Sequence, residues 1–355
     1  MKVVHLLQTM LLSKKKSERM EKLKSPKTYL IIDSANTFFR ARHVVRGEDI
    51  ETKLGLALHI MMNSVKKCWE RFKADHVVFC FEGRSWRKDF YPAYKQNRKV
   101  TRDAMTPAEQ DADELFWQTF DEFKTFVSDK TNCTVLRHAE LEADDLIAGW
   151  TQSHPQDKHI IISSDTDFYQ LLSENVSQYN GITDILANTN GFFDDKDNVV
   201  IDKKTKGPKL APDPEWLLFE KCMRGDSSDN VFSAYPKVRT NKLKEAFQDR
   251  QNQGFVWNNL MLSRWVDHNG KERVVKEEYA KNEQLIDLTK QPDDIKIKIA
   301  DTIASAVDNT KSVGNVGVHL LKFCAKHELV RIRDNVRFYA EPFNARFYQD
   351  QAVAG

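Results

Sequence analysis

The sequence predicts an α/β fold in which helices flank a central, mostly parallel sheet. Three short apolar runs each lead into an acidic residue, at Asp33, Glu82 and Asp165. Short apolar runs bounded by polar residues are typical of strands buried on both faces, as in parallel sheets. Amphipathic patterns over residues 54–72 and 107–127 lie between these runs. Strands that alternate with helices in this way imply right-handed βαβ units.

Composition limits the class of protein. A chain of 355 residues with 41% hydrophobic content can bury one large α/β domain or two smaller ones. Its 54 basic and 52 acidic residues nearly cancel, so attraction to a polyanion must come from local clusters of charge. Five widely spaced cysteines favour a reducing compartment over a disulfide framework or a zinc site. No apolar stretch approaches the length of a membrane span, so we expect a soluble, cytoplasmic protein that contacts no membrane.

We expect three regions along the chain. Residues 1–27 form a basic, mobile extension, and residues 28–210 form the α/β core. Within the core, residues 184–209 are rich in Asn, Asp, Gly and Lys, which predicts a hairpin or loop. From 211 to 355 the strand signal fades and helices dominate. Helical patterns in this last region cover residues 214–224, 237–247 and 277–288.

Nine carboxylates in five places are the candidate metal ligands. They are Asp33, Glu82, the group Glu142, Asp144 and Asp145, the pair Asp165 and Asp167, and the pair Asp226 and Asp229. In open parallel sheets ligands bind beyond the carboxyl ends of the strands, where three of these groups fall. If the groups converge, they could not all stay ionised without counter-cations. Oxygen ligands with no sulfur select hard cations, so we expect Mg²⁺, or Mn²⁺ in its place.

Two such ions in one site would support the hydrolysis of a phosphodiester. Held about 3.5–4 Å apart, they can activate a water and stabilise both oxygens of an in-line phosphoryl displacement. Each acidic group also has a simpler explanation, as a helix cap, as a complement to a helix dipole or as an ordinary polar pair. The repeated placement of acids after apolar strands favours the metal site and hence phosphodiester hydrolysis.

A basic and aromatic stretch follows Glu82 directly. Residues 84–102 contain seven basic side chains, four aromatic ones and a single acid. Basic groups neutralise phosphates and aromatic faces stack on bases, although a solvated loop with packed aromatics would look similar. The residues expected to contact nucleic acid are Lys95 and Arg98 at the scissile phosphate, Arg84 and Arg87 beside them, and Tyr91 and Tyr94 as stacking platforms or core residues.

A second candidate for binding DNA lies at residues 226–247. Here Lys237, Arg239 and Lys242 follow a turn between two helical patterns. Backbone amides and lysines in such a turn could hold duplex phosphates without reading their sequence. An ordinary helical hairpin is the alternative. A third stretch, 337–348, is rich in aromatic residues and is either a docking peptide or a segment packed on the body.

Together these motifs resemble the structure-specific 5′ nuclease (flap endonuclease) superfamily, and most closely its branch of T-even-like phage ribonucleases H. The matching segments are Leu30–Ser34, Phe79–Glu82, Trp86–Lys88, Tyr94–Arg98, Glu142–Asp145, Ser163–Phe168 and Gly225–Asn230. The resemblance implies a PIN-like nuclease core with a helical arch at 84–102. It also implies a helix-hairpin-helix-like element in a helical DNA-binding region at 211–355.

The resemblance further implies two Mg²⁺ ions in one site. The first would lie at Asp33, Glu82, Glu142, Asp144 and Asp165, and the second at Asp167, Asp226 and Asp229. The activities implied are 5′-3′ exonuclease and flap endonuclease action on branched, nicked or 5′-flap DNA and RNA–DNA hybrids, including the removal of RNA primers. A sliding clamp or a single-strand binding protein would be its partner. We expect a monomer, in the cytoplasm of a bacterial host if a phage encodes it.

Two features depart from the family pattern. Glu82 stands where the family usually has Asp, and a shift near 1 Å at a reacting centre can cost about 10²-fold in rate. The Gly-x-Gly turn that holds a monovalent cation in many members is absent before Lys237. A catalytically weakened DNA-binding scaffold therefore stays open as an alternative. So does a PIN-type endoribonuclease, which would not need the basic arch or the helical half.

Overall fold

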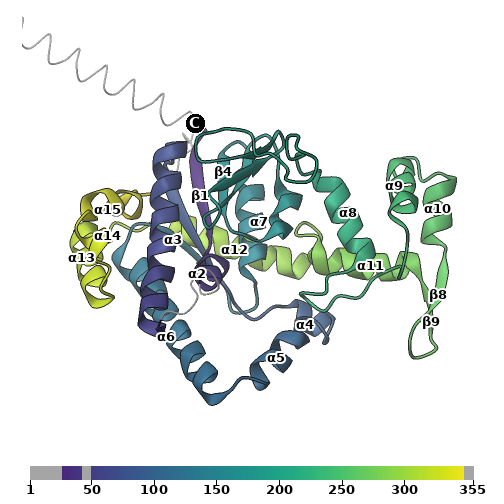
Figure 1. Cartoon of the computed structure of the whole chain (residues 1–355), viewed down its shortest axis with the longest axis horizontal. Helices are drawn as coiled ribbons and strands as arrows, with labels where there is room; N and C mark the ends of the chain where they lie inside the picture. The colour runs from purple at the N-terminus through teal and green to yellow at the C-terminus, as the bar shows by residue number, and fades with distance from the viewer. Residues whose placement is uncertain (1–25, 42–48, 348–355) are drawn as a thin grey trace, which may run out of the picture.

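A seven-stranded sheet forms the centre of the computed structural model, which describes residues 26–41 and 49–347 (Figure 1). The expected extension at 1–27 lies almost wholly outside the described residues. The strands are β1 (Thr28–Asp33), β2 (His76–Phe81), β3 (Thr134–Arg137), β4 (Lys158–Ile162), β5 (Val176–Asn180), β6 (Ile185–Asn188) and β7 (Gly191–Phe193). Their order is β3-β2-β1-β4-β5-β6-β7, and the first five are parallel. The prediction of a mostly parallel sheet is confirmed.

Helices cover both faces of the sheet (Figure 1). Those of the first half are α2 (Ser34–Ala41), α3 (Ile50–Phe72), α4 (Arg87–Phe90), α5 (Gln96–Asp103), α6 (Pro107–Lys130), α7 (Ala143–Ser153) and the 3₁₀ helix η1 (Thr166–Leu171). Those of the second half are α8 (Pro214–Arg224), α9 (Thr240–Asp249), α10 (Phe255–Met261), α11 (Val275–Ile286), α12 (Asp293–Asp308), α13 (Val316–Lys326), α14 (Val330–Arg333) and α15 (Val336–Asn344). No described helix combines the length and apolar character needed to cross a bilayer.

Alternation along the strands sorts the core into two layers. Leu30 and Ile32 of β1 join the cluster formed with α3, α6 and α13, whereas Ile31 joins the cluster formed with α7 and α12. Successive side chains of a strand point to opposite faces, so a strand that is apolar at every position must be covered on both. Strand order reverses at β1, which has β2 on one side and β4 on the other. Such a reversal opens a crevice at the carboxyl ends of the two strands.

The second half of the chain is divided between two places. On α12, Ile295, Ile299 and Ile303 recur at helical spacing and pack against the α7 side of the sheet, while α13 and α15 pack on the opposite side. Helices α9 and α10 form a smaller cluster with a hairpin of β8 (Arg264–Val266) and β9 (Glu272–Val274), at the right of Figure 1. The expected helical region at 211–355 therefore includes a hairpin, and part of it completes the α/β core. Patterning shows which helices are amphipathic but not which surface each one covers.

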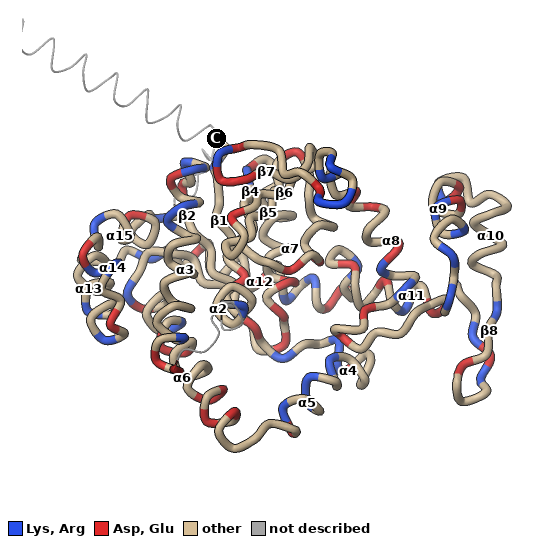
Figure 2. Tube along the Cα trace, in the orientation of Figure 1, with Lys and Arg blue, Asp and Glu red and all other residues tan. Residues whose placement is uncertain are grey.

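A projection of α4, α5 and α6 stands beyond the carboxyl ends of the strands (Figure 1). Its α5 limb carries basic residues, and the first half of α6 carries acidic ones (Figure 2). Thr106 caps the start of helix α6: its hydroxyl accepts from the backbone amide of Glu109, and the Glu109 side chain accepts from the backbone amide of Thr106. Pro107 occupies the first helical position, where its missing N–H costs nothing. The segment predicted as an arch at 84–102 therefore holds α4 and most of α5, and the projection continues into α6.

The aromatic stretch near the C-terminus packs on the body rather than standing free. Tyr339, Phe343 and Phe347 are buried, and Phe343 joins the core cluster under α3 and α6. Phe338 alone among these aromatic residues is strongly exposed within the described chain, at 58%. Tyr348 lies outside the described residues. The structure thus supports packing for the described part of this stretch.

Candidate metal centre and nucleic-acid interface

A pocket of about 610 Å³ lies at the carboxyl ends of the central strands and under the arch. Carboxylates from five positions line it, namely Asp33, Glu82, Glu142, Asp144 and Asp165. Basic side chains also line it, namely Arg40, Lys88, Lys95, Arg98, Lys99 and Arg102. Five of the nine predicted carboxylates therefore share one cavity with both residues predicted to hold the scissile phosphate.

Asp33 ends β1 and is held by the neighbouring strand. Its carboxylate accepts a hydrogen bond from the hydroxyl of Ser163, which follows β4, at 2.8 Å, and one from the backbone of Asn36 at 3.3 Å. Burial, together with the charge of Asp165, raises the pKa of Asp33 to about 6 even though these two bonds lower it. The charge of Asp165 therefore acts on Asp33 across the β1/β4 crevice.

Glu82 follows β2 and is positioned by Gly83. The Gly83 amide donates to the carbonyl of Leu141 at 2.8 Å, and a Cβ at this glycine would lie 2.0 Å from the carbonyl oxygen of His138. Only a residue without a side chain permits this approach, which brings Glu82 beside the start of α7. There its carboxylate accepts from the amide of Ala143 at 3.3 Å.

Glu82 and Asp144 repel each other. Glu82 is accessible to solvent inside the pocket, but the protein around it and the charge of Glu142 raise its pKa to about 7. Burial raises the pKa of Asp144 well above its ordinary value, and the charges of Glu82 and Asp33 add to this effect. Raised pKa values show that these carboxylates lack a positive partner for the charge they would carry at neutral pH.

Ion pairs divide the nine carboxylates into two groups. Within the described chain, Asp33, Glu82, Asp144 and Asp165 have no basic side chain at ion-pairing distance. The other five are each paired: Glu142 with Arg87 and Lys95, Asp145 with Arg87, Asp167 and Asp226 with Lys221, and Asp229 with Lys95 and Arg98. The unpaired four all line the pocket.

This donor set fits a hard divalent cation. All four unpaired groups offer carboxylate oxygens, and the pKa values of Asp33, Glu82 and Asp144 are raised in the absence of a cation. Among the described residues no three acidic, histidine or cysteine side chains are already gathered tightly enough to enclose an ion. Mg²⁺ tolerates such a site because it usually keeps several waters and takes only one or two direct carboxylates.

Arg87 and Asp145 form buried structural contacts, whereas the sequence predicted that Arg87 contacts nucleic acid and that Asp145 binds a metal ion. Arg87 is 1% exposed and donates to Asp145, to Glu142 and to the carbonyl of Leu285, at 2.8–3.0 Å. A buried, fully paired guanidinium cannot reach a phosphate, which corrects the expectation that Arg87 contacts nucleic acid. Asp145 is fully buried, does not line the pocket, and also accepts from the indole of Trp86 at 3.2 Å. Both carboxylate oxygens of Asp145 already accept hydrogen bonds from protein groups, so the assignment of Asp145 as a metal ligand is corrected as well.

Glu142 has features of both groups: it lines the pocket beside the unpaired carboxylates, and it is itself ion-paired. Burial alone would raise its pKa, but Lys95 and Arg87 outweigh that effect and hold it at about 2. Glu142 also accepts from the hydroxyl of Ser85 at 2.7 Å, and the hydroxyl of Tyr94 lies 3.2 Å away. It therefore stays ionised beside the unpaired carboxylates throughout the neutral range.

The two tyrosines of the arch serve packing. Tyr94 is 4% exposed and its hydroxyl donates to Asp229 at 2.8 Å, so its ring cannot stack on a base. Tyr91 is half-buried, with the ammonium of Lys281 at 5.4 Å from its ring centre. The core alternative for these residues holds for Tyr94. Arg84 is exposed but pairs with Asp89.

Lys95 and Arg98 join the arch to the turn after α8. The ammonium of Lys95 pairs with Glu142 and lies 3.5 Å from Asp229, and the guanidinium of Arg98 donates to Asp229 at 2.8 Å. The backbone amide of Lys95 also donates to the carbonyl of Asp229 at 2.8 Å. Lys95 is nearly enclosed, whereas the Arg98 side chain is 58% exposed and open to a ligand.

Sequence reasoning missed two features of the site. Trp117 on α6 lines the pocket with Phe39 of α2, their ring centres 4.4 Å apart. A tryptophan outside the buried stripe of α6 was the available signal. Lys221, near the end of α8, pairs with both Asp167 and Asp226. A lysine on an amphipathic helix ordinarily faces solvent, so nothing in the pattern distinguished it.

The second predicted nucleic-acid element forms the turn between α8 and α9. Lys237 and Arg239 are exposed and unpaired within the described chain, while Lys242 is half-buried with its ammonium 5.2 Å from the ring centre of Tyr235. Lys237 adopts a left-handed backbone with φ of 59°. The turn therefore presents positive charge outward, apart from the carboxylate pocket.

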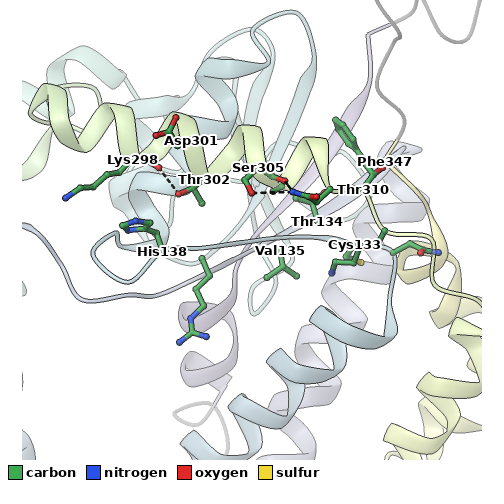
Figure 3. A pocket seen from close by; sticks show the side chains of 15 residues that line it. Cys133, Thr134, Val135, His138, Lys298, Asp301, Thr302, Ser305, Thr310 and Phe347 are labelled. Carbon is green, nitrogen blue, oxygen red and sulfur yellow. Dashed lines mark hydrogen bonds between the residues drawn. The ribbon is translucent and has the colours of Figure 1, made fainter.

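Another pocket, of about 550 Å³, lies between β3 and α12 (Figure 3). None of the nine carboxylates lines it. Lys298 at its rim is already paired with Glu140 at 2.7 Å. It is therefore separate from the carboxylate site.

Comparison with known sequences gives partial but consistent matches. Residues 28–203 match the family described as the 5′-3′ exonuclease, N-terminal resolvase-like domain. The flap endonuclease Xni of Psychromonas ingrahamii is 32% identical over 158 residues, which cover 43% of this chain and 56% of that protein. DNA polymerase I of Borreliella burgdorferi is 26% identical over 212 residues, or 58% of this chain and 21% of that protein. The chain thus spans about half the length of the flap endonucleases it matches.

Solved structures show the same fold. The bacteriophage T5 flap endonuclease, in a pseudo-enzyme–product complex with DNA and metal ions, aligns with a TM-score of 0.51 and 19% identity. The alignment covers 89% of this chain and all of that one. The T5 5′-exonuclease with bound zinc aligns over the same share with a TM-score of 0.50. At this identity the likeness establishes the fold.

Proposed function

Residues 28–203 belong to the 5′-3′ exonuclease N-terminal resolvase-like family, and the chain thereby belongs to the structure-specific 5′ nuclease superfamily. We propose from this that the protein is a divalent-metal-dependent phosphodiesterase. Its substrates are 5′ ends and flaps of DNA and RNA-primed DNA. The preferred ion is Mg²⁺, with Mn²⁺ as a substitute. The activity is hydrolysis from the 5′ end and at the junction of a flap.

One observation carries this proposal. Four carboxylates without ion-pair partners form the floor of the pocket, and basic side chains of the arch line the same cavity. A phosphodiester needs both, because its negative oxygens must be neutralised while an attacking water is activated. Neither a scaffold nor a simple DNA-binding loop requires four neighbouring carboxylates without ion-pair partners, which reduce stability when no cation is present.

Each part of the site then has a role. Asp33, Glu82, Asp144 and Asp165 would hold the ions, which when bound activate water and polarise the phosphoryl oxygens. Arg98, being exposed at the pocket, would hold the phosphate. Lys95 would fix Glu142 and the turn at Asp229 in place and offer a second positive charge to the same phosphate.

The remaining basic surface is proposed to hold the duplex. Lys237 and Arg239, in the turn, and Lys242, in the first turn of α9, do not line the pocket, so they suit a duplex arm whose 5′ end enters the arch. Contacts of this kind act on phosphates and carry no sequence preference. Removal of RNA primers during replication, with a sliding clamp or single-strand binding protein as partner, is the biological role we propose.

The experiment compares cleavage by the wild type with that by Asp144→Asn. A 5′-labelled flap and a blunt duplex of equal length are incubated with each protein in Mg²⁺ or in EDTA. We expect cutting at the flap junction only with Mg²⁺, and a loss of about 10²-fold or more in Asp144→Asn. Asp121→Asn is the matched control and should cut normally, because Asp121 is an exposed acid on α6 that pairs only with Lys124 among the residues the structure describes.

Two outcomes would overturn the proposal. Tight binding of the flap without cleavage in either Mg²⁺ or Mn²⁺ would favour a scaffold. Equal cleavage by the wild type and Asp144→Asn would mean that this pocket is not the catalytic one.

A further inference from the structure

Lys221 lies between two carboxylates that the sequence assigns to a metal ion. Its ammonium pairs with Asp167, on η1, and with Asp226, in the turn after α8, the second contact at 2.8 Å. The Lys221 side chain is 26% exposed and that of Asp226 is 10% exposed. The contact thus joins two segments that are distant in sequence, at a partly enclosed position.

The surroundings place this lysine beside the carboxylate pocket. The carboxylate of Asp165, which lines the pocket, accepts from the backbone amide of Asp167 at 3.0 Å. Asp226 has one carboxylate oxygen turned to Lys221, while the other accepts from the amide and hydroxyl of Ser228, at 2.8 and 2.7 Å. Two of the three acids of the predicted second ion site are therefore oriented toward one cation, the ammonium of Lys221, while the third, Asp229, pairs with Lys95 and Arg98.

We propose that Lys221 is the resident cation of the second ion site, so that the free protein holds one divalent ion and accepts a second only when Lys221 is displaced. This inference rests on the proposed function, because it assumes that divalent ions bind here at all. It adds a residue that determines how many ions the resting site holds.

The physical reason is competition for the same oxygens. A divalent ion at Asp167 and Asp226 must break both ion pairs of Lys221 before it gains their carboxylates. The lysine is tethered to α8, so it competes at a high effective concentration that dilution cannot reduce. By contrast, nothing in the described chain competes in this way for Asp33, Glu82, Asp144 and Asp165.

The test counts bound Mn²⁺ in the absence of DNA, by electron paramagnetic resonance of free Mn²⁺ during a titration at fixed pH. We expect one tightly bound ion in the wild type and two in Lys221→Met, with the second ion bound about tenfold more tightly than in the wild type. Lys281→Met is the matched control. Its side chain is also 26% exposed and also pairs with an acid, Glu278, so it should behave as the wild type does.

A second pair of variants keeps the result interpretable. Asp226→Asn should leave the wild-type count at one, but in the Lys221→Met background it should abolish the gained ion. Thermal melting of each variant, followed by circular dichroism, shows that the fold persists. Equal counts and affinities in the wild type and Lys221→Met would overturn the inference alone. Absence of any tight ion in both proteins would instead overturn the proposed function.

Discussion

The guanidinium of Arg87, at the base of the arch, donates to both carboxylate oxygens of Asp145, in the first turn of α7, at 2.9 and 3.0 Å. Arg87 is 1% exposed and Asp145 is fully buried, so no water screens this fork-shaped contact. The pair fastens the arch to the helix that carries Asp144. Stability of the fold and geometry of the site therefore depend on the same contact.

Replacing Arg87 by Ala should destabilise the protein by about 3–5 kcal/mol, because it leaves Asp145 buried without a partner. The check is the free energy of unfolding in urea. Arg84→Ala is the control, since the exposed Arg84–Asp89 pair should be worth less than about 1 kcal/mol. Equal losses in the two variants would show that Arg87 has no special structural part.

Replacing Gly83 by Ala should cost about 3 kcal/mol or more, because the new Cβ would meet the carbonyl oxygen of His138 at 2.0 Å. Since the backbone must move to relieve this clash, Glu82 should shift and metal-dependent cleavage should fall as well. Gly314→Ala, with nothing within 4 Å of its Cβ, should leave both quantities unchanged. Unfolding and flap cleavage are measured on the same preparations.

Replacing Glu82 by Gln should raise the melting temperature of the metal-free protein in a way that depends on pH. The pKa of Glu82 is raised from 4.5 to about 7, so the folded state is favoured at low pH and loses that advantage as pH rises between these values. The gain from Gln should therefore be absent near pH 4.5 and should grow toward pH 7. Melting curves in EDTA across this window check it. The exposed Glu140, whose pKa is lowered, gives the control Glu140→Gln, which should show no such gain. A gain for Glu82→Gln that did not vary with pH would refute the electrostatic explanation.

Replacing Lys237, Arg239 and Lys242 together by Gln should weaken binding to duplex DNA at every sequence. The logarithm of the DNA-binding constant falls linearly with the logarithm of salt concentration, and the magnitude of this slope should decrease by about two to three. The reason is that the variant loses three phosphate contacts, each of which releases counterions when it forms. The same change at the exposed Lys203, Lys204 and Lys206, in the loop after β7, is the control for total charge. A similar fall in both triple variants would mean that binding depends on net charge and not on this turn.

The sequence was sufficient for the three central strands and for the acids that follow them, but it did not predict β3 or β5. Short apolar runs predicted β1, β2 and β4, and parallel strands necessarily place Asp33, Glu82 and Asp165 at one end. A residue that follows a parallel strand in the sequence therefore lies at a known edge of the sheet.

The sequence did not predict which side chains pair with those acids or which of the acids face the pocket. Asp144 and Asp145 are neighbours on a helix, where consecutive side chains point about 100° apart, so only the position of α7 on the sheet decides which one faces the pocket. Arg87 and Arg84 look alike in a basic stretch, yet one is buried and the other exposed. Charge patterning reports composition, whereas burial depends on contacts that are distant in sequence, such as that of Arg87 with Leu285.

The contacts of Lys95 and Arg98 with Asp229 also set the order in which the site can be completed on the ribosome. The chain emerges from its N-terminus at about 5–20 residues per second. Asp33 and the arch therefore appear well before Asp229, which lies about two-thirds of the way along the chain. Contacts between such distant segments form late because a long loop must close first. A nascent chain therefore cannot form these contacts until about two-thirds of it has been synthesised, so the site is completed late in translation.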